Sequence, residues 1–61
     1  MHDLEQDVRI LIADGHPMFR DALRSLLEQE PGYHVVGEAA DGAEVLEKAK
    51  ELKPDLLLLD L

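Results

Sequence analysis

Hydrophobic residues recur along the chain with two different periods, and the two periods alternate. Residues 8–13 are mostly apolar and β-branched, which predicts a strand. After a turn-forming cluster, apolar side chains return at spacings of three and four residues and predict a helix over residues 17–30. Pro17 suits the first turn of this helix, and Pro31 with Gly32 is expected to end it. The apolar stripe consists of Met18, Phe19, Ala22, Leu23, Leu26 and Leu27.

The same alternation continues in the second half of the chain. Residues 34–39 predict a second strand, and residues 42–52 predict a second helix with an apolar stripe of its own. Asp41 is placed to cap this helix, and Glu44 three residues later completes a capping box. Four consecutive leucines then follow Pro54, so residues 56–60 predict a strand that is buried on both faces.

Strands that alternate with helices indicate an α/β fold with right-handed crossovers and a parallel sheet. The predicted order is β-α-β-α-β over residues 8–61. Residues 1–7 are polar and acidic and are expected to form a flexible tail.

The charge balance excludes two classes of partner for this segment. Six basic residues against 14 acidic ones give a net charge of −8, whereas nucleic-acid backbones and anionic membranes are bound by clustered Lys and Arg. No apolar run approaches the length of a membrane-spanning helix, and the N-terminus lacks the pattern of a signal peptide. Together with the absence of Cys, these features favour a cytoplasmic protein.

A chain of 61 residues without Cys has little to stabilise it as a monomer. Apolar burial contributes roughly 90 kcal/mol by area, and ordering the chain costs roughly the same. Disulfides are excluded, so packing against another copy, or against further chain, is the expected source of stability.

Two carboxylates follow predicted strands. Asp14 comes after the first strand and Asp60 comes at the end of the third. In a 2-1-3 strand order they would converge at the carboxyl edge of the sheet, where open α/β folds bind ligands. Converging carboxylates favour Mg²⁺, and an Asp in this setting can act as a nucleophile toward phosphorus. The alternative is that each Asp only caps a helix or forms a turn.

Two segments of the sequence resemble a known family. RILIADGHPMFRDALRSLL (residues 9–27) and PGYHVVGEAADGAEVLEKAKELKPDLLLLDL (residues 31–61) are similar to the receiver domain of response regulators that carry a LuxR-type (NarL/FixJ) DNA-binding domain. The resemblance implies a doubly wound, flavodoxin-like sheet whose first three strands have the order 2-1-3. It also implies that the chain is truncated, because the family's remaining strands and helices would follow Leu61.

The resemblance also implies roles for particular residues. Asp60 is expected to accept phosphate from a sensor histidine kinase, and in the parent protein this would control transcription. Asp14 matches the first of two acids that help to hold Mg²⁺, so Asp14 and Asp60 are the expected metal ligands. Gly15 stands where the family has the second acid, so metal binding is expected to be weak. No enzymatic activity is expected.

Two other interpretations are compatible with the sequence. The chain could be a half-domain without signalling activity that assembles as a homo-oligomer through its third strand. It could also be a fragment of a phosphatase of the haloacid-dehalogenase type, which also places an Asp nucleophile after an apolar strand. That class requires a second Asp two residues beyond Asp60, a position that the chain does not reach.

Overall fold

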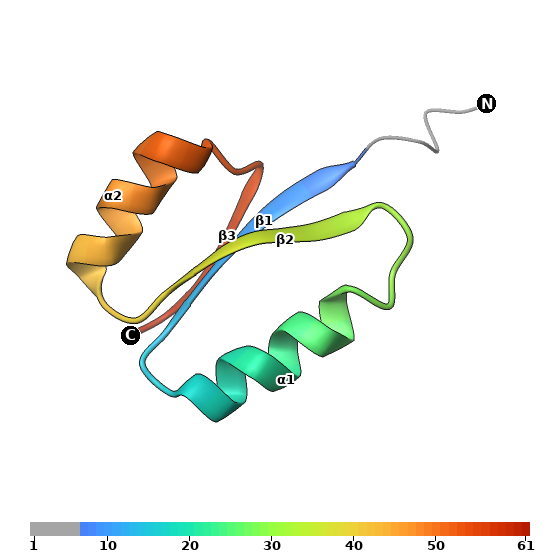
Figure 1. Cartoon of the computed structure of the whole chain (residues 1–61), viewed down its shortest axis with the longest axis horizontal. Coiled ribbons are helices and arrows are strands. Elements are labelled where there is room, and N and C mark those ends of the chain that lie inside the picture. Colours follow the sequence, from blue (N-terminus) through green and yellow to red (C-terminus); the bar gives the residue numbers. More distant parts are fainter. Residues whose placement is uncertain (1–6) are drawn as a thin grey trace.

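The structure, a computed structural model that describes residues 7–61, is a three-stranded parallel sheet with one helix on each face (Figure 1). Both helices connect parallel strands, and the strand order is β2-β1-β3, as the resemblance implied. No helix in this part of the chain is long and apolar enough to cross a membrane. The predicted tail lies, apart from Asp7, outside the described residues. The elements are β1 (Val8–Asp14), α1 (Pro17–Leu27), β2 (Tyr33–Ala39), α2 (Gly42–Leu52) and β3 (Leu56–Asp60).

Helix α1 is shorter than predicted, because it ends at Leu27 and not at residue 30. The next residues form turns in which Gln29 and Glu30 donate to carbonyls three residues earlier. Apolar side chains that could pack on the sheet end at Leu27, and Pro31 disfavours helical geometry at Glu30. Gly32 adopts a φ of 90°, so it forms the turn into β2 and does not cap the helix directly.

The core is centred on β1. This strand pairs with a strand on each side, and Ile10, Leu11 and Ile12 have no exposed surface. On one face Val45 of α2 packs with Ala13 and Ala39. A strand that is enclosed on both faces and both edges consists of a nearly continuous apolar run, and such a run in the sequence predicted β1.

Burial away from β1 is lower than the sequence predicts. Met18 is 87% exposed and Leu26 is also exposed, so part of the apolar stripe on α1 faces solvent and not the core. The prediction that β3 is buried on both faces is likewise wrong, because only Leu58 among its leucines is even half-buried. In the described part of the chain β3 pairs with β1 alone, and it lies at the edge of the sheet.

Helix α2 begins at the predicted cap, Asp41, but the return bond of the capping box goes to the N–H of Ala40, one residue before the N-cap. The Asp41 carboxylate accepts the Glu44 backbone N–H at 2.9 Å, and the Glu44 carboxylate accepts the Ala40 N–H at 2.7 Å. At the other end Lys53 adopts a left-handed φ of 49°, which turns the chain toward β3. These contacts fix both ends of the crossover between β2 and β3.

The register of β3 is set at its amino end. The Asp55 N–H donates to the Arg9 carbonyl at 2.8 Å, and the Arg9 N–H donates to the Asp55 carboxylate at 2.9 Å. The Arg9 side chain also donates to the carbonyl of Lys53 at 2.8 Å. With this register, the opposite ends of β1 and β3 finish level, at Asp14 and Asp60.

Gly37 of β2 lies beneath a side chain of α2. A Cβ atom at this position would lie 2.6 Å from Cδ1 of Leu52 and 3.3 Å from Cδ1 of Leu11. We expect Gly37→Val to destabilise the fold by about 1–3 kcal/mol, because the added side chain crowds the end of Leu52 and the fully buried Leu11. Gly42→Ala is the matched control, since no atom lies within 4 Å of a Cβ there. Urea unfolding followed by circular dichroism measures both, and equal midpoints would contradict the expected crowding at Gly37.

Candidate functional site

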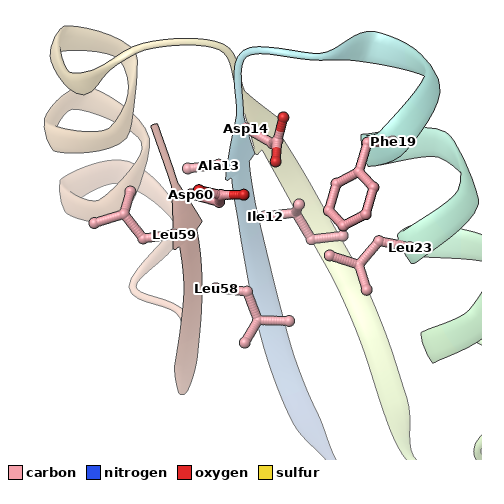
Figure 2. A pocket seen from close by; sticks show the side chains of 8 residues that line it. All are labelled: Ile12, Ala13, Asp14, Phe19, Leu23, Leu58, Leu59 and Asp60. Atoms are coloured by element: carbon pink, nitrogen blue, oxygen red, sulfur yellow. The ribbon is translucent and has the colours of Figure 1, made fainter.

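The carboxyl ends of β1 and β3 bring the two predicted acids to the same edge of the sheet. Asp14 and Asp60 are opposite each other in the register of the parallel pair, so their side chains leave the sheet on the same face. This is the face that α1 covers, and Figure 2 shows the Asp14 carboxylate between the end of β1 and Phe19, with Asp60 beside it at the end of β3.

Asp14 is the buried member of the pair. Its side chain is only 2% exposed, and Oδ1 accepts the His16 backbone N–H at 2.7 Å and lies 2.9 Å from His16 Nδ1. The turn through Gly15 allows both contacts, because it folds the backbone back toward the carboxylate. An acid that is desolvated in this way needs such donors to remain charged.

The pKa of the Asp14 carboxyl lies below its ordinary value. The largest cause is the hydrogen bond from the His16 backbone N–H, which outweighs the opposing effect of burial, and the His16 ring and the Arg20 charge add to the lowering. Asp14 is therefore ionised at neutral pH. Because its pKa is depressed in the folded state, the stabilisation is present above the unfolded pKa and is lost as the pH falls through the folded one.

Asp60 differs from Asp14 in its surroundings. It is the last residue of β3 and is exposed to solvent. A pocket of about 330 Å³ lies between the ends of β1 and β3 and the first turns of α1, and both carboxylates belong to its lining (Figure 2). The remaining lining residues are Ile12, Ala13, Phe19, Leu23, Leu58 and Leu59. An accessible carboxylate beside an apolar wall is open to attack a phosphorus atom presented from solvent.

Two residues of the site's surroundings were not predicted from the sequence. Arg20 of α1 donates from Nη1 to the Asp14 carbonyl at 2.6 Å and from Nε to a Glu38 carboxylate oxygen at 3.2 Å. The sequence shows that Arg20 lies off the apolar stripe of the helix, but it does not show that the partners of Arg20 lie on β1 and β2. The signal that could have revealed Glu38 is its charge near the end of an otherwise largely apolar strand.

The donor set fits Mg²⁺ as a weak site. Mg²⁺ is held in many proteins by one or two carboxylates and several waters, and Asp14 and Asp60 supply two. Within residues 7–61 no cluster of three or more His, Cys, Asp or Glu side chains is placed to hold a metal. Gly15 adds no side-chain oxygen, although a Cβ atom there would meet only the Ala40 carbonyl, at 3.7 Å.

Comparisons with known proteins agree on one family. Residues 10–61 match the response regulator receiver domain. The chain is 44% identical over 54 residues to a protein-glutamate methylesterase/protein-glutamine glutaminase of Alkalilimnicola ehrlichii, covering 88% of this chain and 14% of that protein. It is 46% identical over 54 residues to the transcriptional regulatory protein LiaR of Bacillus subtilis, covering 88% of this chain and 26% of LiaR.

A solved structure gives the same result. The signal receiver domain of the response regulator NarL from Mycobacterium tuberculosis superimposes with a TM-score of 0.85 at 44% identity, covering 90% of this chain and 44% of that one. The chain therefore spans less than half of this structural relative and about a quarter or less of the two proteins above. None of these comparisons supports the phosphatase interpretation.

The metal site generates a test at Gly15. We expect the chain to bind Mg²⁺ no more tightly than about millimolar, because the described residues place two carboxylates at this edge and no cluster of three acidic or imidazole side chains. Gly15→Asp adds a third carboxylate at a position where a Cβ atom makes only an ordinary van der Waals contact, so it should tighten binding by about tenfold or more. Gly42→Asp is the control for an added charge elsewhere. Titrations followed by amide chemical shifts measure the affinity. Micromolar binding by the unaltered chain would contradict this account of the donors.

Proposed function

The chain belongs to the response regulator receiver domain family, and from this premise we propose that it is the phosphate-accepting segment of a two-component response regulator, with Asp60 as the acceptor. The observation that carries the proposal is the pairing of two unlike acids at the carboxyl edge of the sheet. Asp60 is exposed and open to a phosphate donor, whereas Asp14 beside it is buried and held in its charged form.

The proposed reaction is a phosphoryl transfer to a carboxylate. An Asp60 oxygen forms a bond to phosphorus while the bond from phosphorus to the donor breaks, and the leaving group keeps the electron pair of that bond. With phosphohistidine as the donor, the leaving imidazole takes up a proton, and the product is an acyl phosphate on Asp60. Asp14 remains ionised throughout and contributes negative charge that a cation must balance.

Mg²⁺ is the cation that we propose for this balance, with Asp14 and Asp60 as its protein ligands. When bound, such a cation neutralises charge on the phosphoryl oxygens, and this electrostatic term is most of the catalysis in phosphoryl transfer. The chain's own residues supply the rest. Asp14 is held by His16, and the apolar wall formed by Phe19 and Leu23 limits access of water from one side.

The proposed partner is a sensor histidine kinase, and the proposed consequence in a longer protein is control of transcription from a cytoplasmic location. Similarity to a transcriptional regulatory protein and to a NarL receiver supports this output. The chain itself is proposed to have no enzymatic activity, and the methylesterase activity named for one relative is not proposed for it. Its net charge of −8 supports the absence of nucleic-acid contacts by this segment.

Labelling with acetyl phosphate tests the role of Asp60. We expect the unaltered chain to label poorly and only with Mg²⁺, because its metal site is weak. Gly15→Asp should raise the yield several-fold, and Asp60→Asn in that background should abolish it. Asp41→Asn is the matched control, since Asn caps a helix as well as Asp. Mass spectrometry of peptides locates the phosphate, and a label on any other residue would refute the assignment.

We also propose that this 61-residue chain associates through β3. Its leucines are exposed at 42% for Leu56, 38% for Leu57 and 58% for Leu59, and β3 is an edge strand within the described residues. An uncharged apolar edge is a template for pairing with another strand, and a two-fold dimer closes such a contact. Repulsion between chains of net charge −8 opposes association and weakens in salt.

Light scattering over a concentration series tests this association. We expect a dimer that strengthens in salt and is weakened by Leu59→Lys, which places a charge on the edge strand. Leu46→Lys on α2 is the matched control, because Leu46 is 66% exposed but lies away from β3. A cooperative monomer at all concentrations, or equal effects of the two substitutions, would show that β3 is not the contact.

A further inference from the structure

The guanidinium of Arg20 joins three elements next to the site. From its position in α1 it donates through Nη1 to the carbonyl of Asp14 at the end of β1, at 2.6 Å. Through Nε it donates to the carboxylate of Glu38 in β2, at 3.2 Å. The side chain is 17% exposed, so both contacts are largely shielded from water. A planar guanidinium with two fixed donors defines the relative positions of its two acceptors.

The Asp14 carbonyl is a sensitive point for such a contact. The chain leaves β1 there and turns back through Gly15, so that the backbone and the ring of His16 reach the Asp14 carboxylate. The direction of that carboxylate therefore depends on the orientation of the peptide group that Arg20 holds. Outer contacts of this kind orient ligands in many metal sites.

Arg24 provides a natural comparison. Its Nε lies 3.1 Å from the other carboxylate oxygen of Glu38, in an ion pair that lacks the alignment of a hydrogen bond. Arg24 also pairs with Asp21 on its own helix, but among the described residues it makes no hydrogen bond or ion pair with Asp14. The two arginines thus share the anchor on β2 and differ in their contact with the site.

We propose that Arg20 is a positioning residue, which uses Glu38 as an anchor and the Asp14 carbonyl as its target to hold the Asp14 carboxylate in its orientation at the carboxyl edge of the sheet, where Asp60 is its register partner. The metal-binding consequence of this role rests on the proposed function, in which Asp14 and Asp60 hold a cation. The orientation itself is a property of the fold and can be measured without any metal.

Positioning and simple charge predict opposite effects of Arg20 on metal binding. The positive charge of Arg20 repels Mg²⁺ bound near Asp14, so removing that charge alone would strengthen Mg²⁺ binding. Removing an orienting contact weakens binding instead. Arg20→Lys separates the two effects, because it keeps the charge but has a single ammonium group in place of the two-pronged guanidinium.

The experiment compares Arg20→Lys, Arg20→Gln and Arg24→Gln by amide hydrogen exchange and by Mg²⁺ titration, the latter in the Gly15→Asp background. Both Arg20 variants should reduce the exchange protection of the His16 N–H by about fivefold, which corresponds to the free energy of one ordinary hydrogen bond. Arg20→Lys should weaken Mg²⁺ binding by about tenfold, as loss of an outer contact does. Arg20→Gln should weaken it less, because the loss of its positive charge opposes the loss of the orienting contact. Arg24→Gln should change neither quantity, although it also removes an ion pair with Glu38.

Three results would overturn the proposal. Stronger Mg²⁺ binding in Arg20→Gln with no change in Arg20→Lys would show that Arg20 acts only through charge. Equal effects of Arg24→Gln on His16 protection would show a general loss of structure around Glu38. Unchanged His16 protection in both Arg20 variants would show that Arg20 does not orient the turn. If Arg20→Gln does not fold, Arg20→Lys alone tests the positioning role, because a lysine still pairs with Glu38 and should retain the fold.

The same experiment separates this inference from the proposed function. If Gly15→Asp binds no Mg²⁺ with Arg20 intact, the proposed cation site fails. The His16 exchange data in the metal-free chain still determine whether Arg20 holds the turn. Conversely, Mg²⁺ binding that is unaffected by both Arg20 substitutions would leave the cation site standing and would refute the positioning role.

Discussion

The enclosure of β1 is the constraint on which the rest of the structure depends. This strand is paired on both edges and covered on both faces, and its three central residues, Ile10, Leu11 and Ile12, have no contact with solvent. A shift of one residue would exchange the faces of every side chain, so the register is strongly determined. Because Asp14 lies two residues after Ile12, it must emerge on the α1 face at the carboxyl edge of the sheet. The position of the acid is therefore a consequence of how the core packs.

A buried carboxylate next to a second acid would ordinarily take up a proton, and local contacts prevent this at Asp14. The principal stabilising group is the backbone N–H of His16, which any residue at that position except Pro would supply. The charge of Arg20 contributes less, because its guanidinium is directed at the Asp14 carbonyl and at Glu38. The turn geometry thus keeps Asp14 charged, and Arg20 is left to act on the turn itself.

The elements could be predicted from the sequence because each depends on a local pattern, and the hydrophobic period predicted all five in the right order. The pairing of the acids also required the 2-1-3 strand order, which the resemblance implied and which places the carboxyl ends of β1 and β3 side by side. The extent of burial could not be predicted in this way. A stripe shows which face of a helix is apolar, but not how much of that face is covered, so Met18 and the leucines of β3 were wrongly expected to be buried.

Glu38 was missed for a different reason, which lies in the pairing of β2 with β1. Ile10 pairs with Val35 but Leu11 pairs with Gly37, so the intervening residue is an irregularity in the ladder. Without it, Glu38 would pair with Ala13 and point to the α2 face, away from Arg20. With it, Glu38 pairs with Ile12 and its carboxylate reaches α1, while its carbonyl accepts from Lys48 of α2. A bulge of this kind redirects a side chain next to a site, and no pattern of hydrophobic residues encodes it. Both helices are thereby tied to one residue of β2, and the Arg20 that Glu38 holds is the residue that donates to the Asp14 carbonyl at the start of the turn.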